Sequence, residues 1–278
     1  MIAQATDKQT AKPKQARHLV LDIINLVGGY EGTAVIKDCS MQVQKGEIVV
    51  IMGGSGSGKS TFLKHLIGLK EPMNGDVNLF GDSLYDASYL HRLKLLKNIG
   101  VAFQSGALLS SLTVAENVAL PLREHSDLDE QTIDFIVRMK LDFVGLLDKG
   151  HLLPSELSGG MLKRAAVARA IALDPRLTFM DEPSAGLDPV VAAALDDLII
   201  KLKDSLGMSV VVVTHELESA FKIADKIVVL DRGHIIFTGT VKQIKASRNQ
   251  RIQNLINRIP EEEEFDAEAH LKRLFGEL

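Results

Sequence analysis

The sequence predicts an α/β fold with a parallel β-sheet at its centre, and two observations lead to this prediction. Short apolar runs at residues 99–103, 177–180, 210–213 and 227–230 alternate with longer stretches of helical periodicity. This alternation is typical of parallel strands joined by helices, which cover the sheet and leave ligands to bind at the carboxyl ends of its strands. A further apolar run, residues 48–52, leads directly into a glycine-rich turn. We therefore expect functional residues to follow these runs.

The segments on either side of that turn predict a second, smaller sheet. Residues 19–28 and 35–43 have the pattern of β segments, and Asn74-Gly75 indicates a turn into a strand at residues 77–80. Together they predict an antiparallel β-subdomain beside the parallel-sheet core. Residues 1–18 precede it and are mostly polar and basic, which predicts a flexible, solvated N-terminal arm.

Residues 105–172 predict a helical subdomain inserted into the α/β core. The segment has helical periodicity and is punctuated by Pro121, Pro154 and two consecutive glycines. The core itself is expected to close near Gly239. We therefore predict one large domain over residues 19–240 that contains the helical insertion.

The C-terminal extension, residues 241–278, predicts two short amphipathic helices. Ser247 and Gln250 fit a capping box, Pro260 is expected to end the first helix, and residues 261–264 form an acidic spacer. The apolar positions are Ile252, Leu255, Ile256 and Ile259 in the first helix and Leu271, Leu274, Phe275 and Leu278 in the second. Each stripe needs a cover, which is either the chain's own core or a second protomer or other partner. Bound to a second protomer, the extension would brace the dimer.

Composition excludes several classes of protein. The 278 residues are 46% hydrophobic with a net charge of −4, which gives no reason to expect nucleic acid as a partner. Cys39 is the only cysteine, so an intramolecular disulfide and a cysteine-rich metal site are excluded. No apolar run approaches the roughly 18 residues that a membrane-spanning helix needs. We expect a soluble chain, or one held at a membrane through a partner.

The glycine-rich turn after residues 48–52 has the features of a phosphate-binding loop. Its glycines let backbone N–H groups point inward, and the following helix adds unpaired donors and a partial positive charge. Lys59 would contact the β- and γ-phosphates, and the Ser60 hydroxyl would ligate Mg²⁺. A strand before it and a helix after it argue against a flexible linker. The predicted phosphate-binding residues are Gly53, Gly54, Ser55, Gly56, Ser57, Gly58, Lys59, Ser60 and Thr61.

Two further motifs carry chemistry. Asp181 and Glu182 end an apolar strand, where Asp181 would hold the metal and Glu182 would orient or deprotonate a water molecule. Ser158 precedes Gly159-Gly160 at the start of a helix, which either grips a second phosphate group or is an ordinary capped helix.

The order of these motifs resembles that of the ATP-binding-cassette ATPases. The phosphate loop is followed by Gln104, Leu157-Ser158-Gly159-Gly160, Asp181-Glu182, residues 184–188 and His215. The resemblance covers about residues 19–240. It implies a P-loop nucleotide-binding domain of the ABC type, with an antiparallel β-subdomain, a parallel-sheet core and an inserted helical subdomain.

The resemblance also implies roles for individual residues. Tyr30 matches the aromatic residue that stacks on adenine, although it also fits a surface turn tyrosine. Gln104 matches the glutamine that meets Mg²⁺ and the attacking water, and His215 matches the histidine that contacts the γ-phosphate. Met161 stands where the family usually has glutamine.

Dimer formation is part of the same resemblance. Ser158, Gly159 and Gly160 of one protomer would complete the phosphate-loop site of the other, so that two copies enclose two ATP molecules. Asp188 would cross-link the two sites in the closed dimer.

Three segments look like those of the ATPase subunits of Mla-type phospholipid transport systems. They are residues 103–109, residues 117–125 and the signature segment Leu157-Ser158-Gly159-Gly160-Met161. This resemblance implies a homodimer on the cytoplasmic face of the bacterial inner membrane, bound to a permease pair. A small STAS-domain protein and a periplasmic MCE lipid-binding ring would be further partners. ATP hydrolysis would then power phospholipid transport between the inner and outer membranes, with residues 105–125 as candidates for contact with the permease.

Three alternatives remain at this point. A small-solute importer, for example of amino acids, would share every catalytic residue. A DNA-repair or translation cassette is disfavoured by the acidic charge balance and the single phosphate loop. A nucleotide-gated scaffold without turnover would require a damaged catalytic set, yet Lys59, Asp181, Glu182 and His215 are all present.

Overall fold

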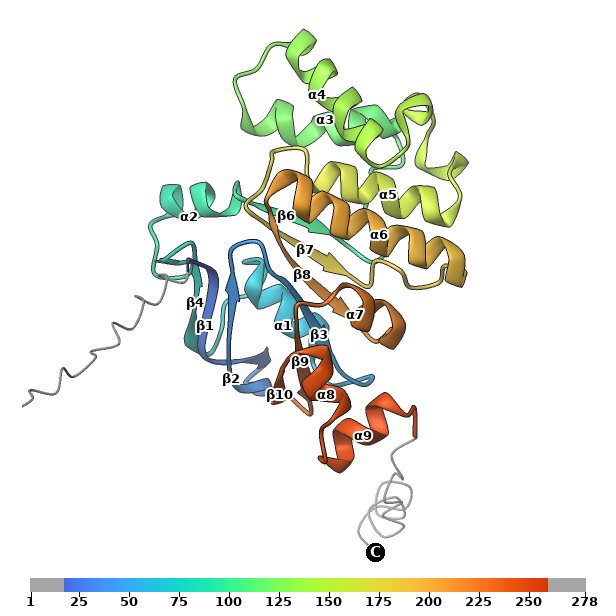
Figure 1. Cartoon of the computed structure of the whole chain (residues 1–278). Helices are drawn as coiled ribbons and strands as arrows, with labels where there is room; N and C mark the ends of the chain where they lie inside the picture. Colours follow the sequence, from blue (N-terminus) through green and yellow to red (C-terminus); the bar gives the residue numbers. More distant parts are fainter. Residues whose placement is uncertain (1–17, 260–278) are drawn as a thin grey trace, which may run out of the picture.

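The computed structural model describes residues 18–259, which form an α/β core, a smaller antiparallel sheet and a helical lobe (Figure 1). The predicted N-terminal arm, except for His18, and the second C-terminal helix lie outside the described residues. Within this described part, no helix is both long enough and apolar enough to cross a membrane.

The smaller sheet has four strands in the order β2-β1-β4-β5, and the pairs β1–β2, β1–β4 and β4–β5 are antiparallel. The prediction of an antiparallel β-subdomain is therefore confirmed. Asn74 and Gly75 lie inside β4 and do not form a turn before it, because Asn74 already pairs with Val27 of β1. The strands are β1 (Leu19–Tyr30), β2 (Thr33–Gln44), β4 (Asn74–Leu79) and β5 (Asp82–Ser83).

The larger sheet has six strands in the order β10-β9-β3-β8-β7-β6 (Figure 1). All pairs are parallel except β9–β10, so the predicted parallel core is confirmed. Every residue of β3 is buried, as expected for a central strand covered on both faces. The strands are β3 (Ile48–Met52), β6 (Ile99–Ala102), β7 (Leu177–Asp181), β8 (Ser209–Thr214), β9 (Lys226–Asp231) and β10 (His234–Gly239).

The two faces of the large sheet belong to different hydrophobic clusters. Val50 of β3 packs with the clustered side chains of the helical side, whereas its neighbours Val49 and Ile51 pack with those of the antiparallel sheet and α1. This alternation is the period of a β-strand, and it fixes the register of β3 between the two layers. The helices of the core are α1 (Lys59–Leu66), α2 (Tyr89–Leu96), α6 (Pro189–Leu206) and α7 (Leu217–Ile223).

The helical lobe is formed by α3 (Val114–His125), α4 (Glu130–Phe143) and α5 (Gly159–Ala170). The expectation that Pro121 punctuates the chain is wrong, because α3 continues through it. A capping box between Thr113 and Glu116 starts α3, and the buried side chains of Val118 and Leu122 hold it in the lobe on either side of the proline. Tertiary packing thus outweighs the hydrogen bond that proline removes.

Two short helices, α8 (Val241–Lys245) and α9 (Gln250–Ile256), follow the core. The predicted Ser247 capping box is wrong: the N-cap is Asn249, whose side chain accepts a hydrogen bond from the N–H of Arg251. Ile252 of α9 is 1% exposed and joins the core cluster on the helical side of the large sheet, and Leu255 and Ile256 pack partly against it. Ile259 is 52% exposed, so the chain itself covers only part of this stripe.

Candidate active site

The phosphate loop connects β3 to α1, and its backbone requires glycine at specific positions. Gly58 is the N-cap of α1 with φ 104°, and a Cβ there would lie 2.8 Å from the side chain of Ile36. A Cβ on Gly53 would lie 2.2 Å from the carbonyl oxygen of Leu230. Gly58 makes no side-chain cap, so the first N–H groups of α1 remain for an anion.

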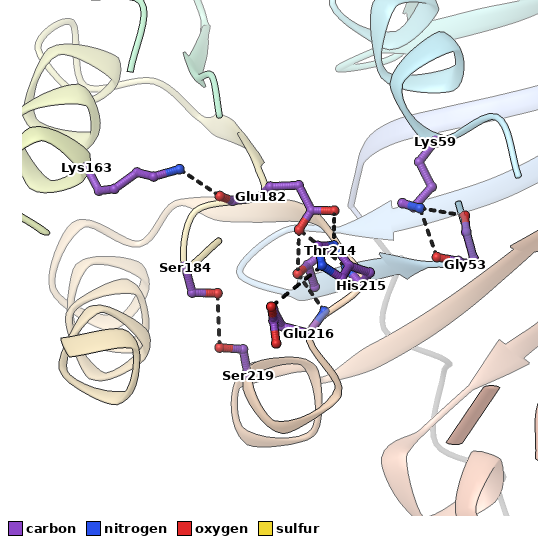
Figure 2. Close-up of polar contacts among 10 residues, drawn as sticks. Gly53, Lys59, Lys163, Glu182, Ser184, Thr214, His215, Glu216 and Ser219 are labelled. Carbon is purple, nitrogen blue, oxygen red and sulfur yellow. Dashed lines mark hydrogen bonds and ion pairs between the residues drawn. The ribbon is translucent and has the colours of Figure 1, made fainter. Parts of the chain in front are cut away.

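Lys59 lies inside this loop. Its Nζ donates to the carbonyl oxygens of Gly53 at 2.8 Å and Gly54 at 2.9 Å (Figure 2). Burial lowers the pKa of Lys59, while the charges of Glu182 and Asp181 oppose that shift. The ammonium is therefore held over the loop by weak neutral acceptors that an anion could replace.

A cavity of about 680 Å³ opens along the phosphate loop. Gln104, which follows β6, Glu182, which follows β7, and His215, which follows β8, contribute to its wall. The carboxyl ends of three parallel strands thus bring these residues to one place, as parallel sheets do. The residues predicted for catalysis and phosphate binding that line the cavity are Gly53, Gly54, Ser55, Gly56, Ser57, Gly58, Lys59, Ser60, Thr61, Gln104, Glu182 and His215.

Glu182 is the most constrained of these residues. It is 7% exposed, its φ is +46°, and one carboxylate oxygen accepts from Thr214 Oγ1 at 3.0 Å. The other carboxylate oxygen lies 2.8 Å from Nδ1 of His215 (Figure 2). A non-glycine residue in the left-handed region is a strained position that the surrounding contacts must hold. Those contacts fix the direction of the carboxylate towards the cavity.

Asp181 is the last residue of β7, directly before Glu182. Burial raises the pKa of Asp181, the neighbouring Glu182 charge raises it further, and the ammonium groups of Lys163 and Lys59 oppose the shift. Lys64 opposes the shift as well, so three lysines lie near the two adjacent carboxylates. Asp181 itself is not among the residues that line the cavity.

The segment Ser158-Gly159-Gly160 is not part of the cavity wall. Ser158 is the N-cap of α5 and its Oγ accepts from the N–H of Met161 at 3.4 Å. A Cβ on Gly160 would lie 2.6 Å from Val191 of α6, so glycine allows close packing there. Asp188 caps α6 by accepting from the N–H groups of Val190 and Val191, at 3.1 Å each. Asp188, like the Ser158–Gly160 segment, is not among the residues that line the cavity.

Tyr30 stands at the end of β1 and is also outside the cavity wall. Its hydroxyl accepts from Lys64 Nζ at 3.2 Å, and Lys70 Nζ lies 4.3 Å from the ring centroid. Hydrogen bonds with Thr61 and then Lys64 lower the pKa of Tyr30. Tyr30 is 43% exposed, and the ammonium of Lys70 lies over its ring.

Sequence reasoning missed four residues at the site, one of which, Val35 of β2, only contributes to the cavity wall. Thr214 holds the Glu182 carboxylate, Leu255 of α9 lines the cavity, and Lys163 of α5 donates to the carbonyl oxygens of Gln104 and Glu182. Thr214 directly precedes His215 and could have been found from that position. Leu255 and Lys163 carry no local signal, because an apolar stripe and a helix lysine have many ordinary roles.

A buried polar network lies behind the site and was also missed. Ser219 of α7 donates to the carboxylate of Asp196 on α6 at 2.8 Å, and its Oγ lies 3.3 Å from Ser184 Oγ (Figure 2 shows the two serines). Asp196 is 3% exposed, and this burial raises the pKa of its carboxyl group. The network joins the loop after Glu182 to two helices of the core.

The family model described as ABC transporter matches residues 36–185. The chain therefore belongs to the ABC transporter family, as an ATPase that binds ATP. A particular protein that it resembles is the intermembrane phospholipid transport system ATP-binding protein MlaF of Haemophilus influenzae, which is 38% identical over 259 residues, 92% of this chain and 98% of that protein.

Two further comparisons concern other members of the family. The probable ribonucleotide transport ATP-binding protein mkl of Mycobacterium leprae is 35% identical over 239 residues, 86% of this chain and 69% of that protein. A solved structure described as a dimeric, post-hydrolysis ATP-binding cassette bound to ADP and Pi has a TM-score of 0.73 and 30% identity, covering 80% of this chain and 98% of its own.

Proposed function

We propose that this chain is the ATP-hydrolysing subunit of a transporter that moves phospholipids between the inner and outer membranes and so maintains the lipid asymmetry of the outer membrane. The observation that carries this proposal is the 38% identity to MlaF over 92% of this chain and 98% of that protein. The cavity that gathers Lys59, Gln104, Glu182 and His215 supports the ATP hydrolysis in this proposal.

ATP binding would begin at the phosphate loop. The β- and γ-phosphates would replace the carbonyl oxygens of Gly53 and Gly54 as partners of Lys59, because a charged acceptor binds an ammonium more strongly than a neutral one does. Ser57 Oγ is buried in the loop without a hydrogen-bond partner among the described residues, which fits a cradle that closes on an anion. Tyr30 would stack on adenine after displacement of Lys70.

The oxygen donors near the loop fit Mg²⁺. Ser60, Gln104 and Asp181 would offer a hydroxyl, an amide oxygen and a carboxylate, which are hard ligands of the kind that Mg²⁺ prefers. When bound, the ion would neutralise charge on the phosphates. The raised pKa of Asp181 fits this assignment, because it reflects a buried carboxylate beside another acid.

Glu182 is positioned to act on the attacking water. The water oxygen would form a bond to the γ-phosphorus while the bond from that phosphorus to the β–γ bridging oxygen breaks, and the water proton would pass to a Glu182 carboxylate oxygen. Thr214 and His215 keep that carboxylate directed at the cavity. The products are ADP and inorganic phosphate.

Completion of the site would require a second copy of the chain. Ser158 and Asp188 are outside the cavity of their own protomer, so they are available to a partner. In a symmetric homodimer the Ser158–Gly160 segment of each protomer would cap the nucleotide on the phosphate loop of the other. The γ-phosphate would favour the closed pair, and its loss on hydrolysis would let the protomers separate. The related dimeric cassette bound to ADP and Pi supports this arrangement.

The membrane partners would dock on the helical lobe. A pocket of about 560 Å³ lies between β6, α2, α3 and the end of α5, and Pro121, Glu124 and His125 of the predicted permease-contacting segment line it. A permease helix seated there would place this chain on the cytoplasmic face of the inner membrane. A STAS-domain protein and a periplasmic MCE ring would complete the assembly.

A second candidate function is the import of a small solute such as a ribonucleotide. The observation that favours it is the 35% identity to a protein named as a probable ribonucleotide transport ATP-binding protein. The two functions share the hydrolytic site and differ in the permease. The cargo that copurifies with the membrane complex distinguishes them.

The test is a pull-down of the intact membrane complex with lipid mass spectrometry and ATPase assays, in the wild type and in Glu182→Gln. We expect the variant to bind ATP and stay dimeric while turnover falls by about 10²–10⁴, the usual contribution of a general base. Glu218→Gln is the control, because this α7 carboxylate is exposed and away from the cavity. Wild-type turnover in Glu182→Gln would remove Glu182 from its role, and a complex that contains no phospholipid would favour the importer.

A further inference from the structure

We propose that Lys163 is a positioning residue for hydrolysis. It would fix the backbone at Gln104, in the loop after β6, and the backbone at Glu182, in the loop after β7, relative to α5. The proposal rests on the function proposed above and names the element that aligns that site. Lys163 Nζ donates to the backbone oxygen of Gln104 and, at 2.9 Å, to the backbone oxygen of Glu182 (Figure 2 shows the contact with Glu182).

These two carbonyl groups belong to the residues whose side chains act in the cavity. Gln104 is 59 residues and Glu182 is 19 residues from Lys163 in the sequence, so one ammonium joins three separate segments of the chain. Glu182 needs this support in particular, because its φ of +46° is strained for a residue with a side chain. Thr214 and His215 hold its carboxylate, and Lys163 holds its backbone.

The surroundings of Lys163 argue against a purely structural role. Within residues 18–259 it has no ion-pair partner, although it is partly buried and its burial lowers its pKa. The charges of Glu182 and Asp181 oppose that shift, so the ammonium lies in the field of both carboxylates. A partly desolvated cation that bonds only to carbonyl groups is costly, and a neutral residue would pack there at lower cost.

The position of Lys163 on α5 gives the contact a mechanical consequence. Ser158 caps α5, and Lys163 lies within the first two turns of the same helix. A movement of the Ser158 segment towards the partner's nucleotide would therefore carry Lys163, and with it the backbones of Gln104 and Glu182. In this way α5 links the site that a protomer caps in its partner to the site that it operates itself.

Arg169, also on α5, provides a comparison within the same helix. Its guanidinium donates to Ala107 O at 2.7 Å and Gly106 O at 3.0 Å, so it anchors the loop after Gln104 but does not contact Glu182. Substitution of Arg169 therefore loosens one loop, whereas substitution of Lys163 releases both. Comparison of the two substitutions therefore distinguishes loss of the contact with the loop after Gln104 from loss of the contact that positions Glu182.

The experiment uses the full chain with its membrane partners and measures kcat, KM, melting temperature and the Kd of trinitrophenyl-ATP. We expect Lys163→Met to lower kcat by about tenfold or more with the Kd within about twofold of wild type, because positioning affects turnover more than ground-state binding. Lys163→Arg, which keeps a cationic donor, should recover kcat to within about threefold of wild type. Lys201→Met, an exposed lysine on α6, is the control for charge.

The alignment is also tested in the Glu182→Gln background. If Lys163 acts through Glu182, adding Lys163→Met there lowers the residual turnover by less than about twofold, since residues that act as a unit are not additive. Arg169→Met should lower kcat less than Lys163→Met does. The inference is overturned if Lys163→Met keeps kcat within about twofold of wild type, or if its loss of kcat is matched by losses in melting temperature and nucleotide affinity. It is also overturned if the loss of kcat in the double variant equals the product of the losses in the two single variants. A wild-type chain without ATPase activity would contradict the proposed function itself.

Discussion

At the scale of single residues, Met161 directly follows the Ser158-Gly159-Gly160 segment at the start of α5. Its backbone N–H, and not its side chain, is what the Ser158 cap uses. The Met161 side chain instead packs against the hydrophobic core of the helical side. The cap and the neighbouring glycines are therefore independent of the residue type at position 161.

Substitutions at Met161 and Ser158 should consequently have opposite outcomes. We expect Met161→Gln to keep ATPase activity within about threefold, because glutamine and methionine have similar helix propensity. Ser158→Arg should abolish turnover, because it removes the α5 cap, worth about 1 kcal/mol, and places a bulky cation where the partner's nucleotide would lie. Steady-state ATPase assays with both variants decide this, and equal activities would refute the role given to Ser158.

Residue types and the family resemblance together predicted most of the cavity. The phosphate loop with Lys59, and Glu182, were predicted from their positions after apolar strands, because parallel strands bring their carboxyl ends together. Gln104 and His215 were predicted from the resemblance. Lys163 could not be predicted in the same way. Its partners are backbone carbonyl groups, which every residue has, and their approach depends on how α5 packs in three dimensions.

At the scale of elements, strands were more predictable than helix ends. Apolar runs bounded by turns located the parallel strands, because a central strand must be buried on both faces. The start of α9 after Asn249 and the passage of α3 through Pro121 depend on which cap and which packing prevail locally. Neither choice is visible in a periodic pattern.

The buried carboxyl group of Asp196, which joins α6 to Ser219 of α7 by a hydrogen bond, should make the stability of the chain depend on pH. Burial raises the pKa of Asp196 above its usual 3.8, so the folded chain binds this proton more tightly than the unfolded chain does. The ionised carboxylate therefore reduces stability at neutral pH, and this cost shrinks as the pH falls towards the raised pKa. A neutral amide in place of the Asp196 carboxylate would still accept the hydrogen bond from Ser219 without carrying a charge.

We therefore expect Asp196→Asn to stabilise the chain at pH 7 by about 1 kcal/mol, or roughly 2–4 °C in melting temperature for a protein of this size. The gain should narrow when thermal unfolding is measured at about pH 5. Asp197→Asn is the matched control, because that neighbour forms an exposed ion pair with Lys222 and should change stability by less than about 1 kcal/mol. A destabilised Asp196→Asn, or a gain that is independent of pH, would contradict this explanation.

At the scale of the whole molecule, the fold places the residues proposed to bind the nucleotide and the segment proposed to cap a partner's nucleotide in two different parts of the protomer. The large sheet gathers the phosphate loop and the side chains predicted to be catalytic in one cavity, while the helical lobe carries Ser158 on α5 outside it. In the proposed dimer, a protomer alone would have a nucleotide site without its cap. Hydrolysis would therefore require a second copy of the chain to supply that cap.

The most direct measurement mixes two inactive variants, Lys59→Ala and Ser158→Arg, and assays ATPase activity with the membrane partners present. About half of the randomly paired dimers would be mixed, and each mixed dimer would hold one intact site that combines the wild-type phosphate loop of one protomer with the wild-type Ser158 of the other. We predict that the mixture recovers up to about one quarter of wild-type activity. No recovery, with mixed dimers demonstrated by pull-down through different tags, would contradict the claim that two copies share each site.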